Sequence, residues 1–299
     1  MWEFKVPQKR FKIGKVEVGG IPGEYATVLV GSMFYHKHKI VINERTGEFD
    51  KAAAEKLVNL QEEFSDKTGN PCMIDVVGTS PETLSKYLDF LAGVTDAPLL
   101  MDGVSSSIRL GTLDWVKESG LQDRIVYNSL TPEYTPEEME KIKETGITSS
   151  IILAYYMKDF TTKGRVYAIK KLVEEASKYG VDKPLVDTCV IDVPSLGIGA
   201  NVIQIIKDET GLPVGCGAHN AIGTWRGLKK KMGKQALHPA MAAANVLSAS
   251  VGADFLLYGP IEACEYMFPV IAMVDAAYGQ LQMEKGKMPS RMHPIFRIA

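Results

Sequence analysis

Four side chains able to form several hydrogen bonds each follow a short apolar run. They are Asp102 at the end of PLLMD, Asn128 at the end of RIVYN, Asp187 within PLVDT, and Asn220 shortly after LPVGCG. Carboxylates accept hydrogen bonds from N–H groups, while amides both donate and accept them. A carboxylate also takes two parallel hydrogen bonds from a guanidine-like edge. Together these residue types suit a planar heterocycle with many N–H groups, such as a reduced pterin.

Other interpretations of these residues stay open at this point. Any one Asp or Asn after a strand is commonly a helix N-cap or a turn former. A metal site is disfavoured, because two of the four residues are neutral amides and the zinc spacing His36-Lys37-His38 lacks a third positioned ligand. Strand-end lysines are missing from PLVDT, which disfavours Schiff-base chemistry. We therefore predict a binding site without a metal.

The elements that position these residues follow from an alternation of apolar runs and helix-period segments. We count eight βα units, whose strands are expected at 27–31, 72–78, 98–102, 124–128, 149–156, 184–190, 212–217 and 254–259. None of these runs shows the alternation of an exposed antiparallel strand, so all are expected to be buried parallel strands. Eight units in this length predict a (β/α)8 TIM barrel, with a doubly wound open sheet as the alternative. We expect one domain over 1–299, with an N-terminal extension, 1–22, forming a hairpin over the barrel floor.

Capping residues set the expected helix boundaries. Asp50 and Ser80 precede helical stripes, and Gly69 and Gly146 follow them. Thr135 precedes Pro136, and Glu138 occupies the third helical position, so we predict a capping box in which Glu138 bonds back to the Thr135 backbone.

A barrel brings the carboxyl ends of all its strands to one face, where active sites of this architecture lie. Asp102, Asn128, Asp187 and Asn220 are therefore expected to converge there. Other residues expected to line the same mouth are His38, Tyr155, His219, Tyr258 and Glu262.

Composition limits the partners and the compartment. Lys and Arg total 34 against 36 acidic residues, for a net charge of −2, so no basic field is available for nucleic acid. The four cysteines are widely spaced without a CxxC pair, which indicates a reducing environment. The sequence has neither a signal-like apolar segment at its start nor a run of about 18 apolar residues. We expect a cytoplasmic protein that does not interact with membranes.

Three long stretches carry a family resemblance: GGIPGEYATVLVGSMFYHKHKIV (19–41), FDKAAAEKLVNLQEEFSDKTGNP (49–71) and DFLLYGPIEACEYMFPVIAMVD (254–275). They closely resemble the H subunit of tetrahydromethanopterin S-methyltransferase and its stand-alone bacterial relatives. MDGVSSS followed by YNSL is more distantly similar to corrinoid/iron–sulfur protein methyltransferases and dihydropteroate synthases, both pterin-binding barrels. The resemblance implies a soluble bacterial relative that moves a methyl group from a corrinoid partner protein (methylcobalamin) to N5 of tetrahydrofolate, and it implies a homodimer.

By this resemblance, Asp187 binds the ring N–H and exocyclic amine of the pterin, and Asp102 and Asn128 bind other ring nitrogens. Asn220 matches the asparagine that reaches N5, although His219 precedes it where those relatives carry another residue. Asn220 and Asp102 are the expected catalytic residues. Alternatives are the same transfer with tetrahydromethanopterin within a larger complex, and a non-catalytic pterin-binding subunit. A condensing enzyme like dihydropteroate synthase is disfavoured, because its pyrophosphate would need basic residues after the seventh and eighth strands.

Overall fold

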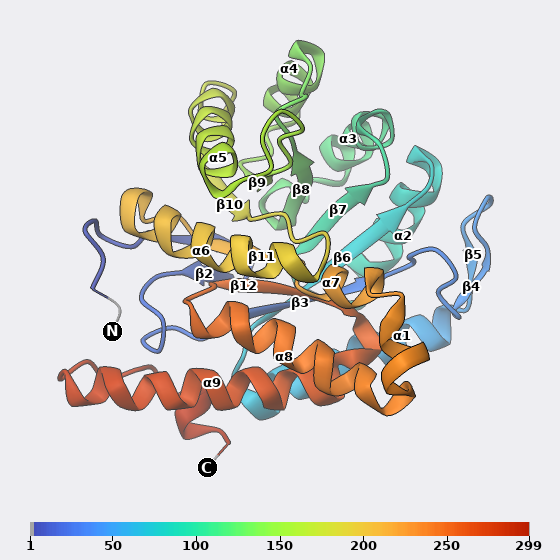
Figure 1. Ribbon diagram of the computed structural model, residues 1–299. Coiled ribbons are helices and arrows are strands. Elements are labelled where there is room, and N and C mark those ends of the chain that lie inside the picture. Colours follow the sequence, from blue (N-terminus) through green and yellow to red (C-terminus); the bar gives the residue numbers. More distant parts are fainter. Residues whose placement is uncertain (1–2, 299) are drawn as a thin grey trace.

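The structure is a computed structural model that describes residues 3–298. Eight parallel strands close into a barrel, each beside the next along the chain, and β12 pairs with β3 to complete the ring (Figure 1). The predicted TIM barrel is confirmed, and closure excludes the open sheet. The barrel strands are β3 (Val28–Met33), β6 (Cys72–Gly78), β7 (Leu99–Gly103), β8 (Ile125–Leu130), β9 (Ser149–Leu153), β10 (Lys183–Asp187), β11 (Val214–Cys216) and β12 (Phe255–Pro260).

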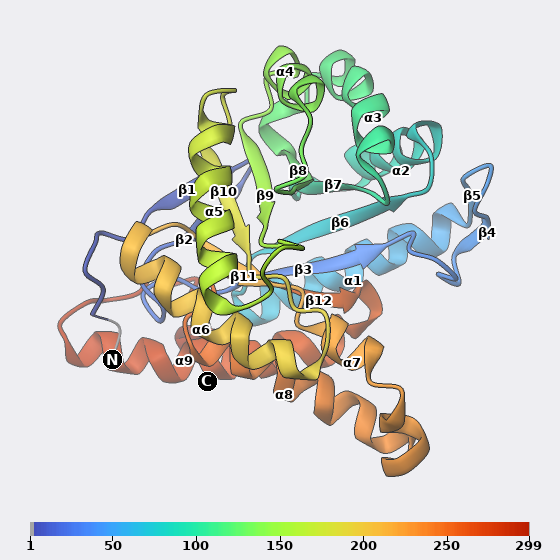
Figure 2. The same ribbon diagram turned by 45° about the horizontal axis from the view of Figure 1, so that its top comes forward.

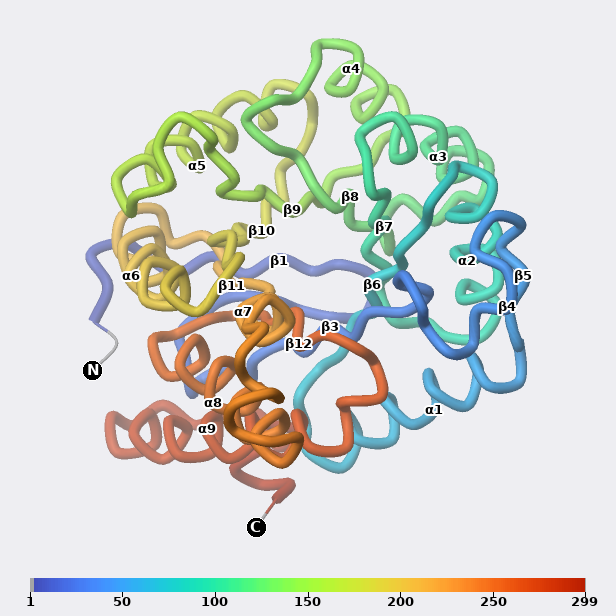
Figure 3. Tube along the Cα trace, turned by 45° about the vertical axis from the view of Figure 1, so that its right-hand side comes forward, coloured from blue at the N-terminus to red at the C-terminus, as the bar shows by residue number. Residues whose placement is uncertain are grey.

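Helices surround the strands as an outer ring (Figure 3). The α-helices are α1 (Lys51–Thr68), α2 (Pro81–Val94), α3 (Ser106–Ser119), α4 (Pro136–Thr145), α5 (Thr162–Ser177), α6 (Val193–Thr210), α7 (His219–Thr224), α8 (Leu237–Ser250) and α9 (Cys264–Glu284). Short helical turns are η1 (Gln122–Arg124), η2 (Leu228–Met232), η3 (Lys234–Ala236), η4 (Ile261–Ala263) and η5 (Pro294–Phe296). In the part of the chain described, no helix combines the length and apolar character needed to cross a membrane.

Local signals set most helix ends as predicted, with one correction. The Asp50 carboxylate accepts from the Ala53 N–H at 3.0 Å to begin α1, and left-handed Gly69 follows its last residue. Thr135 caps α4 through the Glu138 N–H at 3.1 Å. The predicted capping box is wrong, because the Glu138 side chain turns inward and accepts from the Tyr127 hydroxyl. Burying that phenol against α4 requires an acceptor, and Glu138 supplies it.

Inside the barrel, one apolar layer fills the space between the strands. It includes Val30, Met73, Leu100 and Leu185, and the alternate strand residues point outward to pack against the helices. The N-terminal segment forms an antiparallel hairpin of β1 (Arg10–Ile13) and β2 (Val16–Gly19). Its side chains Ile13, Val16 and Val18 join this interior layer and close the lower end of the barrel.

A second hairpin, β4 (Val41–Asn43) with β5 (Glu48–Phe49), lies between β3 and α1 and projects at one edge of the molecule (Figure 2).

One buried ion pair joins the outer helices to the barrel. Lys207 Nζ on α6 lies 2.6 and 2.7 Å from the two carboxylate oxygens of Asp254, directly before β12. It also donates to the Gly20 carbonyl at 3.1 Å, beyond the N-terminal hairpin. Asp254 further accepts from the Val214 N–H at 2.8 Å. Removing either charge would leave the other buried without an opposite charge beside it.

We therefore expect Lys207→Met to lower the free energy of unfolding by about 3–5 kcal/mol, measured by urea denaturation. The control is Lys170→Met, which removes an exposed lysine paired with Glu209 and should change that free energy by less than about 1 kcal/mol. Equal effects of the two substitutions would contradict the anchoring role of Lys207.

Candidate functional site

A cavity of about 440 Å³ lies at the carboxyl ends of the strands. Its lining comes from all eight barrel strands or the segments that follow them: Ser32, Tyr35, Asp75, Val77, Asp102, Asn128, Ser129, Leu153, Asp187, Gly217, His219, Asn220, Leu257, Gly259 and Pro260. The four polar residues predicted to converge, Asp102, Asn128, Asp187 and Asn220, are all among them. The volume falls in the range of small-molecule sites, about 300–1,000 Å³.

The polar lining follows from the two-residue period of a strand. Met73, Leu100 and Leu185 face the apolar interior. Two residues further along each strand, the side chain points to the same face, and these positions are Asp75, Asp102 and Asp187. On these three strands the inward-facing side chain therefore changes from apolar to carboxylate two residues further along. The cavity begins at the level of the carboxylates.

The alternative of simple helix capping is excluded for three of the four residues. The N-caps of α3, α4 and α6 are Ser105, Thr135 and Asp192, each several residues beyond the strand-end Asp102, Asn128 and Asp187. Those three side chains are thus available to the cavity.

Asp75 is a functional candidate that the sequence analysis missed. Its carboxylate accepts from Ser32 Oγ at 2.7 Å and from Asn128 Nδ2 at 3.0 Å, so it fixes the orientation of the Asn128 amide. The pKa of Asp75 is raised to about 6. Burial raises it, and the two hydrogen bonds, which stabilise the charged form, limit that rise. A single carboxylate inside the otherwise apolar run CMIDVVG was the available signal.

Asp102 lies on the next strand and shares this electrostatic environment. Burial raises its pKa well above the usual value, and the nearby Asp75 charge raises it further. The guanidinium of Arg109 on α3 opposes both effects, and it donates to the carbonyl of Gly103, the residue after Asp102, at 2.8 Å. The two carboxyls therefore favour ligands that supply N–H groups.

Asp187 is held by the loop that follows it. Its carboxylate accepts from the Cys189 N–H at 2.7 Å, with Cys189 in the left-handed region at φ 61°. The buried Arg165 of α5 clamps this loop by donating to the carbonyls of Thr188 and Cys189 at 2.6 and 2.7 Å. The pKa of Asp187 is raised to about 6. Burial is the main cause, and it outweighs the Cys189 N–H and the Arg165 charge, which act to lower the pKa. The side chain is thus fixed in one orientation.

His219 and Asn220 lie together at the start of α7 and both line the cavity. His219 Nδ1 is 2.9 Å from the Leu257 carbonyl oxygen, a contact that ties the ring to β12. Burial lowers the pKa of His219. The ring is therefore neutral at neutral pH.

Two tyrosines predicted at the mouth lie elsewhere. Tyr258 is fully buried and donates to Gln61 Oε1 at 2.5 Å. Its neighbours Leu257 and Gly259 face the cavity, so Tyr258, between them on β12, points outward to the helices. The prediction that it lines the cavity is wrong. Tyr155 packs edge-on against Phe160, with ring centroids 5.5 Å apart, and Leu153 lines the cavity in its place.

His38 and Glu262 form a supporting cluster beside the cavity rather than part of its lining. The buried His38 ring accepts from the Phe34 N–H through Nδ1 at 2.9 Å, so Nε2 carries the hydrogen directed at Glu262, 3.1 Å away. The ring stacks on Tyr35 at 4.3 Å, and Tyr35 does line the cavity. The cluster therefore positions Tyr35.

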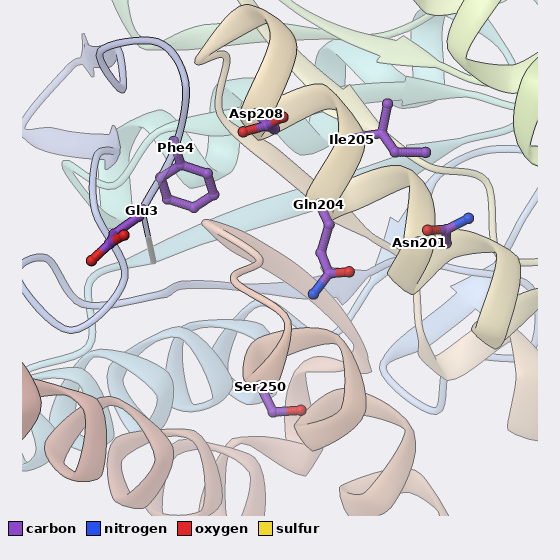
Figure 4. Close-up of a pocket in the computed structure, with 7 residues that line it drawn as sticks. All are labelled: Glu3, Phe4, Asn201, Gln204, Ile205, Asp208 and Ser250. Atoms are coloured by element: carbon purple, nitrogen blue, oxygen red, sulfur yellow. The ribbon is translucent and has the colours of Figure 1, made fainter. Parts of the chain in front are cut away.

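A second hollow lies on the outside of the barrel (Figure 4). Four of its residues come from α6, and the others come from the N-terminal segment and the end of α8: Glu3, Phe4, Asn201, Gln204, Ile205, Asp208 and Ser250. It lacks the convergence of strand-end groups seen at the mouth. Over residues 3–298, no group of three or more His, Cys, Asp or Glu side chains is arranged to hold a metal ion.

Comparison with known proteins identifies the family. A family model described as the tetrahydromethanopterin S-methyltransferase MtrH subunit matches residues 6–289. The chain belongs to this family. The H subunit of tetrahydromethanopterin S-methyltransferase from Methanothermobacter thermautotrophicus is 37% identical over 309 residues, covering all of both chains. The H subunit of the putative methyltransferase mtx from Methanosarcina mazei is 37% identical over 306 residues, covering 99% of each.

Solved structures support the fold of this MtrH family member. Yersinia pestis dihydropteroate synthase in a sulfonamide drug complex aligns with a TM-score of 0.62 at 13% identity, covering 91% of this chain and all of that one. Xanthomonas albilineans dihydropteroate synthase in complex with 7,8-dihydropteroate aligns with a TM-score of 0.57 at 13% identity, covering 92% and 99%. These alignments support the same TIM-barrel fold for this chain.

The raised pKa of Asp75 makes stability depend on pH. Because the folded value of about 6 lies above the usual 3.8, the folded state holds this proton more tightly, and stability falls as pH rises from about 4 to 6. Asp75→Asn removes that loss. The quantity to compare is the unfolding free energy of the variant minus that of wild type. We expect this difference to be about 2–3 kcal/mol larger at pH 7.5 than at pH 4, as measured by urea denaturation at both pH values.

The control for this prediction is Asp114→Asn, whose side chain is 71% exposed. Its difference from wild type should not vary with pH. A pH-independent difference for Asp75→Asn would show that folding does not raise the pKa of Asp75.

Proposed function

We propose that the protein transfers a methyl group between N5 of a tetrahydropterin and the cobalt of a corrinoid carried by a separate protein. The observation that carries the proposal is the convergence of Asp102, Asn128, Asp187 and Asn220 in one cavity of an MtrH family member. Asp75 adds a third carboxylate to the lining. An anionic wall of this kind suits the N–H edge of a pterin rather than a pyrophosphate, which disfavours a condensing reaction.

Pterin recognition is assigned to the carboxylates. Asp187, fixed by the Cys189 N–H and backed by Arg165, binds the ring N–H and the exocyclic amine through parallel hydrogen bonds. Asp102 and Asn128 lie side by side on the paired strands β7 and β8 and bind the other ring nitrogens. A ligand that donates to these oxygens supplies the hydrogen bonds that burial removed, so it favours their charged forms.

The chemistry asks for little covalent participation by the protein. Methyl transfer is an in-line displacement, in which one nucleophile, N5 or cobalt, replaces the other at the methyl carbon. The site contributes by holding N5 at the open mouth, within reach of the corrinoid, and by stabilising charge that changes at N5. The Asn220 amide donates to a neutral N5 or accepts from a protonated one, so it serves both stages.

The identity of the pterin is the part of the proposal on which the comparisons bear most. The resemblance of the sequence to stand-alone bacterial relatives implied tetrahydrofolate. The relative from Methanothermobacter thermautotrophicus is named for tetrahydromethanopterin, and both relatives are named as H subunits, which supports tetrahydromethanopterin as the substrate and assembly with other subunits. We therefore propose tetrahydromethanopterin as the substrate. A homodimer and a cytoplasmic location stay predictions.

The deciding experiment mixes the purified protein with a methylated corrinoid, either free methylcobalamin or a corrinoid protein, and each tetrahydropterin in turn. Demethylation is followed by the change in corrinoid absorbance. We expect pterin-dependent demethylation, faster with tetrahydromethanopterin. Faster turnover with tetrahydrofolate would reverse the substrate assignment. Pterin binding without demethylation of either corrinoid would indicate a non-catalytic subunit and end the proposal.

The assigned roles predict different defects for two variants. Asp187→Asn should weaken tetrahydropterin binding about 10- to 100-fold, because it removes a charge-assisted acceptor. Asn220→Ala should keep the dissociation constant within about twofold but lose most of the transfer rate, because its partner is the reacting nitrogen. Calorimetry gives the dissociation constant, and corrinoid absorbance gives the rate.

Matched controls are Asp182→Asn, exposed at the opposite end of the β10 region, and Asn201→Ala on the outer face of α6. Neither should alter binding or rate. Equal losses of binding in Asp187→Asn and Asn220→Ala would refute the separation of recognition from chemistry.

A further inference from the structure

His219 presents one unoccupied nitrogen to the cavity. Its Nδ1 lies 2.9 Å from the Leu257 carbonyl oxygen. A carbonyl only accepts hydrogen bonds, so Nδ1 carries the hydrogen and the lone pair of the neutral ring lies on Nε2. Across residues 3–298, the Leu257 contact is the one hydrogen bond found for this imidazole. The ring thus offers a fixed basic nitrogen.

Two glycines show where this ring points. A Cβ built on Gly217 would lie 2.9 Å from Asn220 Nδ2 and 3.5 Å from His219 Cε1, so both side-chain ends approach the same point. Cε1 is bonded to Nε2 in the imidazole ring. A Cβ on Gly259, which has φ of +104°, would lie 3.1 Å from His219 Cβ and Cγ. Because Gly259 has no side chain, the His219 ring has room to lie against β12.

We propose that His219 Nε2 accepts the proton of the tetrahydropterin N5 during methyl transfer and returns it in the reverse direction. This inference rests on the proposed function, which places N5 at Asn220. It assigns His219 as a catalytic residue, in addition to the amide that orients the nitrogen.

The proton step conserves atoms and electrons. The N5 lone pair forms a bond to the methyl carbon while the carbon–cobalt bond breaks, and that bonding pair stays on cobalt. N5 then carries a positive charge together with its hydrogen. The proton moves to His219 Nε2, the N–H pair returns to N5, and the imidazolium passes the proton to water. In reverse, protonated His219 gives N5 the proton that makes it a neutral leaving amine.

The other titratable groups lining the cavity are Tyr35, Asp75, Asp102 and Asp187. Burial raises the pKa of Tyr35, so its phenol keeps its own proton, and the proposed function assigns Asp102 to other ring nitrogens. Asp75 and Asp187 already accept hydrogen bonds from Ser32, Asn128 and the Cys189 N–H, and they come from β6 and β10. His219 is next to Asn220 on α7, and burial lowers its pKa so that the ring stays an unprotonated base at neutral pH.

The test compares His219→Gln with His238→Gln, a matched substitution at an exposed histidine stacked on Tyr266 of the outer helices. With saturating tetrahydromethanopterin and methylcobalamin, we expect the turnover number of His219→Gln to fall about 100-fold while the pterin dissociation constant changes less than twofold. His238→Gln should match wild type. Added imidazole should restore part of the rate of His219→Ala, which a purely structural role would not allow.

Unchanged turnover in His219→Gln, or a lost rate that imidazole does not restore, would overturn the assignment of His219. Because wild type is assayed alongside, absence of transfer in wild type counts against the proposed function instead. If the variants fail to fold, nitrogen NMR of wild type decides. We expect the hydrogen on Nδ1 and a shift of the Nε2 signal when tetrahydropterin binds. A hydrogen on Nε2 would overturn the proposal.

Discussion

Closure of the barrel is the constraint from which the site follows. Each parallel strand must place alternate residues inside, and those residues fill the interior from the hairpin upward with Val30, Met73, Leu100 and Leu185. One step further along three of the strands the inward residue is a carboxylate. The cavity is therefore the last interior layer, made polar. Its geometry is as rigid as the barrel itself, because the same hydrogen-bonded ladder holds both layers.

Protein groups, instead of water, donate hydrogen bonds to two of the buried carboxylates. Asp75 receives two side-chain donors, and Asp187 receives a backbone N–H from a loop clamped by Arg165. Burial nevertheless raises the pKa of both to about 6. Such a site costs stability in the free protein and gains charge-assisted hydrogen bonds when a donor-rich ligand arrives, a common relation between function and stability.

The sequence predicted most of what depends on local pattern. Apolar runs located all eight strands, and strand-end polarity located Asp102, Asn128, Asp187 and Asn220 in the cavity. Asp75 escaped because it lies in mid-strand, where no turn marks it. Tyr258 was misplaced because a buried run does not reveal which residues face inward. Glu138 was misread because its acceptor role depends on Tyr127, a contact between elements that capping rules do not contain.

The packed barrel interior gives this cavity a single entrance. The apolar layer of Val30, Met73, Leu100 and Leu185, continued by the hairpin at the lower end, leaves the carboxyl face as the route for exchange. Under the proposed function, a small pterin and a large corrinoid protein use that same opening. The pterin then has to enter before the protein covers the mouth, and it leaves after the protein withdraws. Under the proposed function, the apolar layer that fills the barrel therefore imposes a compulsory order of binding and release at its mouth.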